Sequence, residues 1–146
     1  MRKSLLFFAF VFLVFLGGCA PLCSGNRSEI KAPHTGLIVD TRGTGLQPSM
    51  HPKIVKEGDS KVVYEMCDRE TGRQMGIVAY SYSIKEAADK AQSGENPLVV
   101  RAIGTDTTLK SVMITSRDAA LVAQADQQNQ FLKKCAVVIV LDRGKK

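Results

Sequence analysis

The chain has 146 residues, of which 20 are Lys or Arg and 14 are Asp or Glu, and its formal net charge is +6. This length leaves room for one modest domain and excludes a multi-domain enzyme. One apolar run opens the chain, and no second run is long enough to cross a bilayer, which excludes a multi-span membrane protein.

Residues 1–18 have the pattern of a secretory signal peptide. Residues 1–3 are short and basic, an apolar run covers residues 5–16, and Gly17 and Gly18 supply small residues at a cleavage site. The run is shorter than the about 20 apolar residues that a permanent membrane helix needs. We therefore expect an exported protein, which excludes a soluble cytoplasmic one.

The end of this signal, Leu16-Gly17-Gly18-Cys19, resembles the lipobox of bacterial lipoproteins. The resemblance implies cleavage before Cys19, a diacylglyceryl thioether on its sulfur and an acyl chain, such as palmitate, on the new amino terminus. Two or three acyl chains together anchor a protein stably, whereas one holds it only marginally. Ala20 follows the cysteine where an Asp is absent, as in lipoproteins sorted to the outer membrane of double-membraned bacteria. The alternative is an ordinary signal followed by a chance cysteine.

Residues 19–35 are rich in Pro, Ser, Gly, Asn and charge, and predict a lipidated tether that includes His34. We expect one folded domain over residues 36–142 and a basic tail over residues 143–146. Cys23 lies in the tether, where it could cross-link chains, carry a second lipid or have no role.

Cys67 and Cys135 both lie within the predicted domain. They could form a disulfide in an oxidising compartment, and Cys135, which opens an apolar run, could equally be a buried free thiol. Sequence alone does not decide between the two. The absence of a Cys-x-x-Cys motif argues against a thioredoxin-type redox role.

Two continuous apolar runs, at residues 37–39 and 136–141, predict central strands buried on both faces. Shorter strands are expected between them, with hairpin turns at residues 56–59 and 104–106. These shorter strands are predicted at residues 53–55, 61–66, 76–82, 98–103 and 109–115.

Two helices are predicted. Ser83 and Glu86 form a capping box for a helix that ends at Gly94, and Thr115 or Ser116 begins a second helix with a polar, Gln-rich outer face. The order of elements predicts an α+β fold: a mostly antiparallel sheet of about seven short strands, with both helices on one face. Residues 76–82 carry no charge and are the candidate for an open sheet edge.

Candidate functional residues follow the first apolar strand. Consecutive amides of the Arg42-Gly43-Thr44-Gly45 turn could form an anion-binding nest, although a tight turn is the simpler interpretation. Asp40 and Asp142 end the two apolar strands and would meet if these strands were neighbours; we interpret them as structural.

His51 lies between two prolines, two residues after Ser49. Spacing alone does not place a base against a nucleophile, so we interpret it as a solvent-facing loop residue. No spacing of ligands matches a zinc or calcium site.

Residues 35–54, 96–102 and 131–142 resemble segments of small, mostly uncharacterised bacterial outer-membrane lipoproteins, some of them associated with flagellar assembly. The shared segments are structural in character and imply no catalytic residue. This chain has His51 where the pattern has a Ser, and Cys67 is not part of the pattern.

From these features we expect a non-enzymatic lipoprotein of the outer membrane, facing the periplasm, that acts as a structural or assembly accessory of the cell envelope. Its partners would be the membrane, through the anchor, and envelope proteins or further copies of the chain. Nucleic acid, cofactors and metals are not expected. The alternative is a small ligand-binding or peptidoglycan-associated module that uses the 42–45 turn and the loop at residues 47–52. An enzyme comes third.

The first prediction concerns the anchor. Cys19→Ser should abolish incorporation of labelled palmitate and leave uncut precursor, because the thiol is the group that accepts the lipid. Labelling and electrophoresis of the precursor measure both effects. Palmitate entering the variant at the wild-type level would contradict the lipobox.

Overall fold

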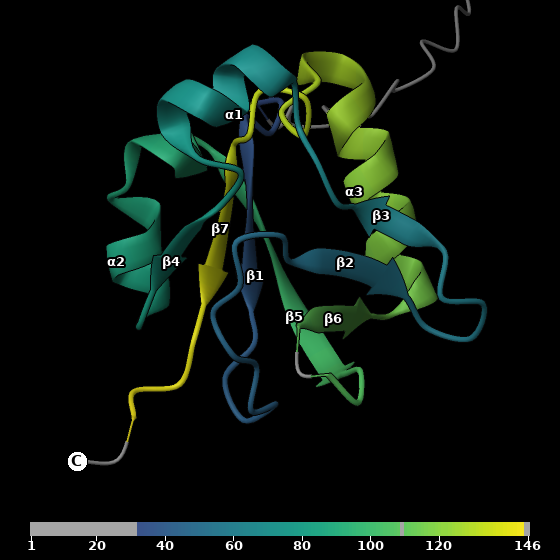
Figure 1. Ribbon diagram of the computed structural model, residues 1–146. Coiled ribbons are helices and arrows are strands. Elements are labelled where there is room, and N and C mark those ends of the chain that lie inside the picture. Colours follow the sequence, from purple (N-terminus) through teal and green to yellow (C-terminus); the bar gives the residue numbers. More distant parts are fainter. Residues whose placement is uncertain (1–31, 109, 145–146) are drawn as a thin grey trace, which may run out of the picture. The chain divides into compact units, whose positions relative to one another are not determined.

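The computed structural model describes residues 32–108 and 110–144, so the signal peptide, Cys19, Cys23 and most of the predicted tether lie outside the described residues. The strands are β1 (Gly36–Asp40), β2 (Lys53–Lys56), β3 (Val62–Tyr64), β4 (Ala79–Ser81), β5 (Pro97–Thr105), β6 (Ser111–Ile114) and β7 (Val137–Val140) (Figure 1). The helices are α1 (Arg69–Met75), α2 (Ile84–Ala88) and α3 (Ser116–Asn129), with a short 3-10 helix η1 (Ala91–Ser93). None of the helices in this part of the chain has the length and hydropathy to cross a membrane.

The strands form one seven-stranded mixed sheet in the order β3-β2-β6-β5-β1-β7-β4. The pairs β1–β5, β1–β7, β4–β7 and β2–β6 are parallel, and only β2–β3 and β5–β6 are antiparallel. The α+β class is confirmed, but the prediction of a mostly antiparallel sheet was wrong. The two predicted hairpin turns do join antiparallel strands. The connections from β3 to β4 and from β4 to β5, in contrast, contain helices and return the chain in the same direction.

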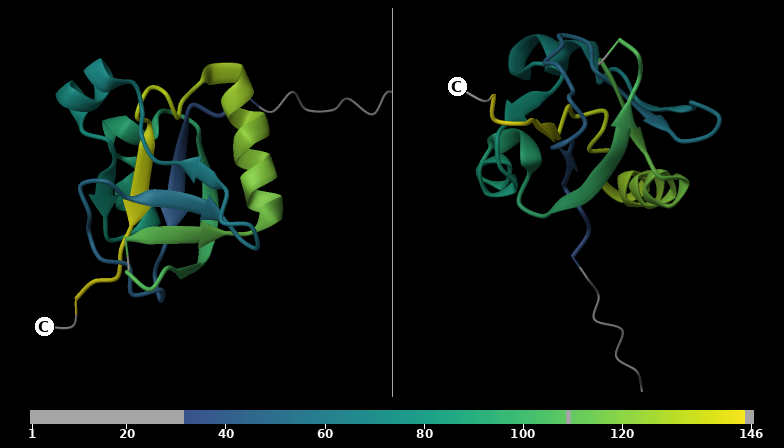
Figure 2. Two further views of the ribbon diagram at one scale, coloured as in Figure 1. Left: turned by 45° about the vertical axis from the view of Figure 1, so that its right-hand side comes forward. Right: turned by 90° about the horizontal axis from the view of Figure 1, so that it is seen from below.

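The two predicted helices cover opposite faces of the sheet, not one face as expected. In β1, Leu37 and Val39 pack in the same cluster as Ala119 and Val122 of α3. Ile38 points the other way and packs with Ala87 of α2. Figure 2 shows the two helices on different sides of the strands. Because successive strand side chains alternate between faces, a continuous apolar run such as that of β1 requires cover on both sides.

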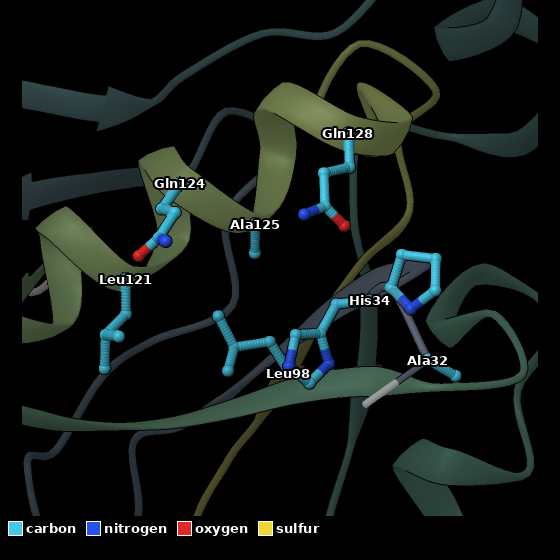
Figure 3. Close-up of a pocket in the computed structure, with 8 residues that line it drawn as sticks. Ala32, His34, Leu98, Leu121, Gln124, Ala125 and Gln128 are labelled. Carbon is cyan, nitrogen blue, oxygen red and sulfur yellow. The ribbon is translucent and has the colours of Figure 1, made fainter. Parts of the chain in front are cut away.

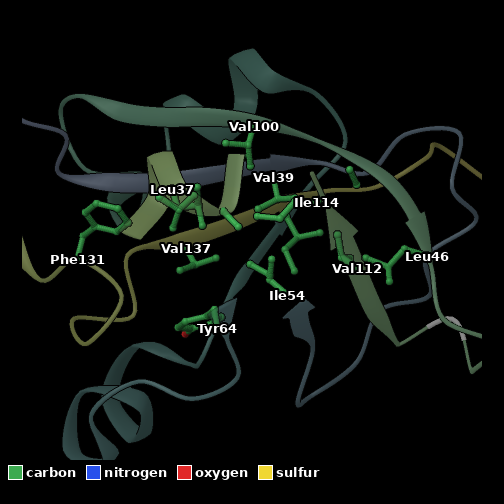
Figure 4. Packing of buried hydrophobic residues seen from close by; sticks show 14 of the residues in the cluster. Leu37, Val39, Leu46, Ile54, Tyr64, Val100, Val112, Ile114, Phe131 and Val137 are labelled. Atoms are coloured by element: carbon green, nitrogen blue, oxygen red, sulfur yellow. The ribbon is translucent and has the colours of Figure 1, made fainter. Parts of the chain in front are cut away.

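The larger hydrophobic cluster lies on the α3 side of the sheet (Figure 4). Its buried residues are aliphatic apart from Tyr64, the two cysteines Cys67 and Cys135, and the fully buried Phe131, which lies just after α3. Leu46 reaches this cluster from the long loop after β1 and is only 6% exposed. That loop is therefore held to the domain by core packing.

The two residues predicted to cap the amino ends of helices do so in the structure. The hydroxyl oxygen of Ser83 accepts the amide of Glu86, and that of Thr115 accepts the amide of Asp118. The helix predicted between Ser83 and Gly94, however, is α2 only as far as Ala88. The short 3-10 helix η1 follows after two residues and is capped by Gly94.

Helix α1 was not predicted from the sequence. Its N-cap is Asp68, whose side chain accepts the amide of Thr71, but it has no buried residue and contains Gly72. It therefore lacks the apolar periodicity by which helices are recognised.

Cys67 and Cys135 form a disulfide that joins the start of α1 to the start of β7 across a sequence separation of 68 residues. Both cysteines are buried, with Gly72 packed against the sulfur of Cys67. The bridge thus ties the surface helix α1 to the central strands.

We predict that removing this bridge lowers the free energy of unfolding by roughly 4 kcal/mol, because the closed loop restricts the unfolded chain. Urea unfolding of the oxidised and reduced protein measures the difference. The variant Cys67→Ala/Cys135→Ala should match the reduced protein and be insensitive to reductant. Equal stability of oxidised and reduced protein would contradict a stabilising role.

Candidate functional site at the carboxyl edge of the sheet

The parallel strands β1, β4, β5 and β7 all end at one edge of the sheet, which we call the carboxyl edge. Residues 41–52, the long loop after β1, lie at this edge, where the C-terminal segment also leaves β7 (Figure 1). Open sheets of parallel strands bind ligands at this edge. The carboxyl edge also brings together the candidate residues of this loop and the two strand-end aspartates, Asp40 and Asp142.

Asp40 and Arg42 form a bidentate ion pair. Arg42 Nε donates to Asp40 Oδ1 and Nη2 donates to Oδ2, each at 2.8 Å. The Arg42 amide adds a third bond to Oδ1 at 3.2 Å. These bonds lower the pKa of the Asp40 carboxyl below its ordinary value, against the opposing effect of partial burial. Asp40 is therefore held ionised and is a poor proton acceptor near neutral pH.

Asp142 binds the turn that the sequence marked as a possible anion nest. The Gly43 amide donates to both carboxylate oxygens of Asp142 at 3.0 Å. Gly43 has φ +86° and Gly45 φ +74°, a conformation that favours glycine. The Thr44 amide donates to the Thr41 carbonyl at 3.1 Å, so this carboxylate of the same chain is bound by the Gly43 amide and not by a nest of consecutive amides. An external anion would have to displace Asp142.

The rest of the loop is fixed by three further contacts. The Thr41 hydroxyl, which is buried, donates to the Val140 carbonyl at 2.7 Å. The Tyr80 hydroxyl donates to the Ser49 carbonyl at 2.7 Å and accepts the Ser49 amide at 2.9 Å. Together with Leu46 in the core, these bonds attach the loop to β7 and β4. The tyrosine contact joins residues 31 apart and has no signal in the sequence.

His51 does not form a catalytic pair with Ser49. The bond between them runs from the His51 backbone amide to the Ser49 hydroxyl oxygen at 3.2 Å, and the residue is exposed. Within the described parts of the chain, no group of three or more His, Cys, Asp or Glu is arranged to hold a metal ion. The carboxyl edge is thus a network of carboxylates and donors that bind one another.

A hollow of about 210 Å³ lies between α3 and β5 (Figure 3). His34 and Leu98 lie on one side of it, and Leu121, Gln124 and Gln128 on the α3 side. Figure 3 shows the amide of Gln128 directed toward the His34 ring. His34 was predicted to lie in the tether, and this hollow was not predicted, although Gln124 and Gln128 are four residues apart and so share a helix face.

The last residues of the predicted tether are in contact with the domain. The Asn96 side chain donates to the carbonyl of Ala32 at 2.8 Å, and the Asn129 side chain donates to that of His34 at 2.7 Å. The amide of Thr35 donates to the Asn96 carbonyl at 3.0 Å. Residues 32–35 therefore form a strap across the amino end of the sheet.

The comparison with known families concerns the domain that follows this strap. A family model described as the second domain of Treponema pallidum Tp0624 matches residues 36–143, from the first residue of β1 to the residue after Asp142. The chain belongs to the family of the Tp0624 second domain. The match includes every strand and helix given above and both strand-end aspartates of the carboxyl edge. No curated protein matches the sequence significantly.

The Asp40–Arg42 ion pair at the carboxyl edge of this Tp0624-type domain predicts how its free energy of unfolding changes at acidic pH. Because the pKa of Asp40 is lowered on folding, its contribution to stability is present above the ordinary value of about 4 and is lost as pH falls through that value toward the lower folded pKa. Asp40→Asn should therefore lower the free energy of unfolding near neutral pH and reduce its fall between neutral pH and about pH 3.

Urea unfolding across this pH range measures the effect. Asp89→Asn, at an exposed aspartate that ends α2, is the matched control and should leave the pH dependence nearly unchanged. An Asp40→Asn variant with the wild-type pH dependence would show that the ion pair does not stabilise the fold.

Proposed function

We propose that this chain is a lipid-anchored lipoprotein of the outer membrane, facing the periplasm, and that it acts as a non-enzymatic structural or assembly accessory of the cell envelope. The signal peptide, the lipobox at Cys19 and the resemblance to small envelope lipoproteins support the location. The link of some of those lipoproteins to flagellar assembly makes a flagellum-related role part of the proposal.

The observation that carries the proposal is the outer strand β4. In the described part of the chain it is the last strand of the sheet, so one side of its backbone has no strand beside it. Residues 76–84, which surround it, contain no charged side chain, and Tyr82 is 50% exposed. The nearest charge is the Glu86 carboxylate of α2, which accepts the Tyr82 amide at 3.3 Å just after the strand and leaves Ala79–Ser81 without charge. Proteins usually block such edges with charge or Pro unless they use them for pairing. An extended segment of an envelope partner could add to this edge by main-chain hydrogen bonds.

The carboxyl edge supports a role without catalysis. Asp40, Arg42, Gly43 and Asp142 bind one another, which makes them a rigid support for the loop. The same contacts weigh against the alternative, a ligand-binding or peptidoglycan-associated module that uses the 42–45 turn. His51 and the exposed Met50 remain at the surface of this loop.

We predict that tagged protein recovers stoichiometric partners from detergent-solubilised envelopes and is not retained on purified cell-wall sacculi. Tyr82→Lys should reduce partner recovery several-fold, because a charge beside β4 opposes strand addition. Ser81 is unsuitable for this test, since it is 3% exposed and its hydroxyl donates to Glu86.

Val99→Lys, at a similarly exposed apolar residue of β5, is the control and should keep its partners. Asp142→Asn and His51→Ala should also keep them. Retention on sacculi without protein partners would favour the alternative function. If His51→Ala abolished the cellular activity of the protein while its melting temperature and partner recovery stayed unchanged, the result would favour an enzymatic function.

A further inference from the structure

The other end of the sheet is formed by β3, a second open edge with a different charge pattern. Among residues 32–108 and 110–144, β3 pairs only with β2, and no strand lies beyond it in the sheet. Lys61 lies directly before β3 and Glu65 directly after it, so opposite charges bracket three apolar or aromatic residues. Figure 1 shows β3 at the outer end of the sheet, near α3.

This pattern is complementary to itself. If two copies of β3 run antiparallel and are centred on Val63, each Val62 lies opposite the partner's Tyr64, and each Lys61 lies opposite the partner's Glu65. Both ends of the pair then join unlike charges, the arrangement that stabilises antiparallel strands. A parallel arrangement would instead place Lys61 beside Lys61 and Glu65 beside Glu65.

We propose that two copies of this chain form a twofold dimer by antiparallel pairing of their β3 edges. Such an interface is isologous, so it closes with two copies and does not extend into a fibre. The inference concerns the surface of the described domain and leaves β4 free for the partner considered above.

The charged residues at β3 are available for this contact. Lys61 is exposed and takes part in none of the ion pairs of the described residues. Glu65 already binds Lys53, whose Nζ lies 2.6 Å from Oε1, but a carboxylate can accept more than one donor. The second copy's lysine would therefore join an existing ion pair.

The surface beside β3 can receive apolar side chains from the second copy. Val62 is 46% exposed. A groove of about 480 Å³ lies between the strand and α3; its lining includes Lys61, Val62, Val63, Ala119, Ala120 and Ala123. The small alanine side chains on the helix leave this groove open. Pairing of the edges would bring the partner's exposed Val62 to its mouth.

The contact is short, and a register shift in the β2–β3 pair leaves Val63 without an opposite residue on β2. Short strands and bulges limit edge pairing, so we expect a weak dimer. Attachment to a membrane would raise its population, because it confines the copies to two dimensions. In this respect alone the dimer rests on the proposed anchor.

Charge reversal tests the pairing. Two differently tagged full-length copies are expressed in one cell, and dimers are trapped in the membranes through a thiol at the twofold axis, Val63→Cys, in a Cys23→Ser background. Opposite residues of an antiparallel pair lie within disulfide range. Lys61→Glu or Glu65→Lys in both copies should lower the yield about tenfold, because two unlike pairs become two like pairs.

Co-expression of one Lys61→Glu copy with one Glu65→Lys copy should restore the mixed dimer, since both pairs are then again unlike. A folding defect in either variant would not be rescued in this way. Lys85→Glu, at an exposed lysine of α2, makes the same charge change elsewhere and should have no effect.

Val99→Cys is the control for thiol position and should cross-link slowly. Cross-linking of Val99→Cys as fast as that of Val63→Cys, or faster, would overturn the proposal. So would a failure of the Lys61→Glu and Glu65→Lys copies to form the mixed dimer. A disulfide-linked dimer of the Cys23→Ser chain that lacks Val63→Cys would indicate that Cys19 is a free thiol. That result would contradict the proposed lipid anchor and not the β3 contact.

Discussion

β1 is buried on both faces and flanked on both sides by parallel strands, and the rest of the domain is arranged around it. Its central residues are completely inaccessible, so α3 must cover one face while α2 and η1 cover the other. Its first residue must be glycine, because a Cβ at Gly36 would overlap the carbonyl of Ser93. At its other end the chain leaves the core at Asp40, which determines where the carboxyl edge and its loop lie.

The local features of this fold follow from short stretches of sequence, whereas its topology does not. The apolar runs of β1 and β7, the N-caps at Ser83 and Thr115 and both hairpin turns were predicted and are present. The predicted direction of strand pairing was wrong because the two hairpins were taken to be typical of the whole sheet. The apolar runs of β1 and β7 already indicated parallel pairing, since strands buried on both faces are typical of parallel sheets with helices on each side.

The candidate site was predictable in its residues and not in its contacts. Asp40 and Asp142 were recognised as the ends of two strands, and those strands are neighbours. That Asp142 would fill the turn at Gly43 depends on a register between residues 99 apart, which no local pattern contains. The Tyr80–Ser49 bond and the position of His34 beside α3 depend on the same kind of long-range placement. The sequence could suggest an anion nest, but only the fold shows that the chain supplies the anion.

The strap at residues 32–35 enters the amino end of β1, while the loop at residues 41–52 and the C-terminal segment lie at the opposite end (Figure 1). A pull between the strap and anything bound at the carboxyl edge would therefore act along β1 and load it in shear against β5 and β7. The evenly spaced hydrogen bonds of parallel pairs would share that load, so they would not open one after another. A pull in this direction would therefore have to break several hydrogen bonds of β1 at once.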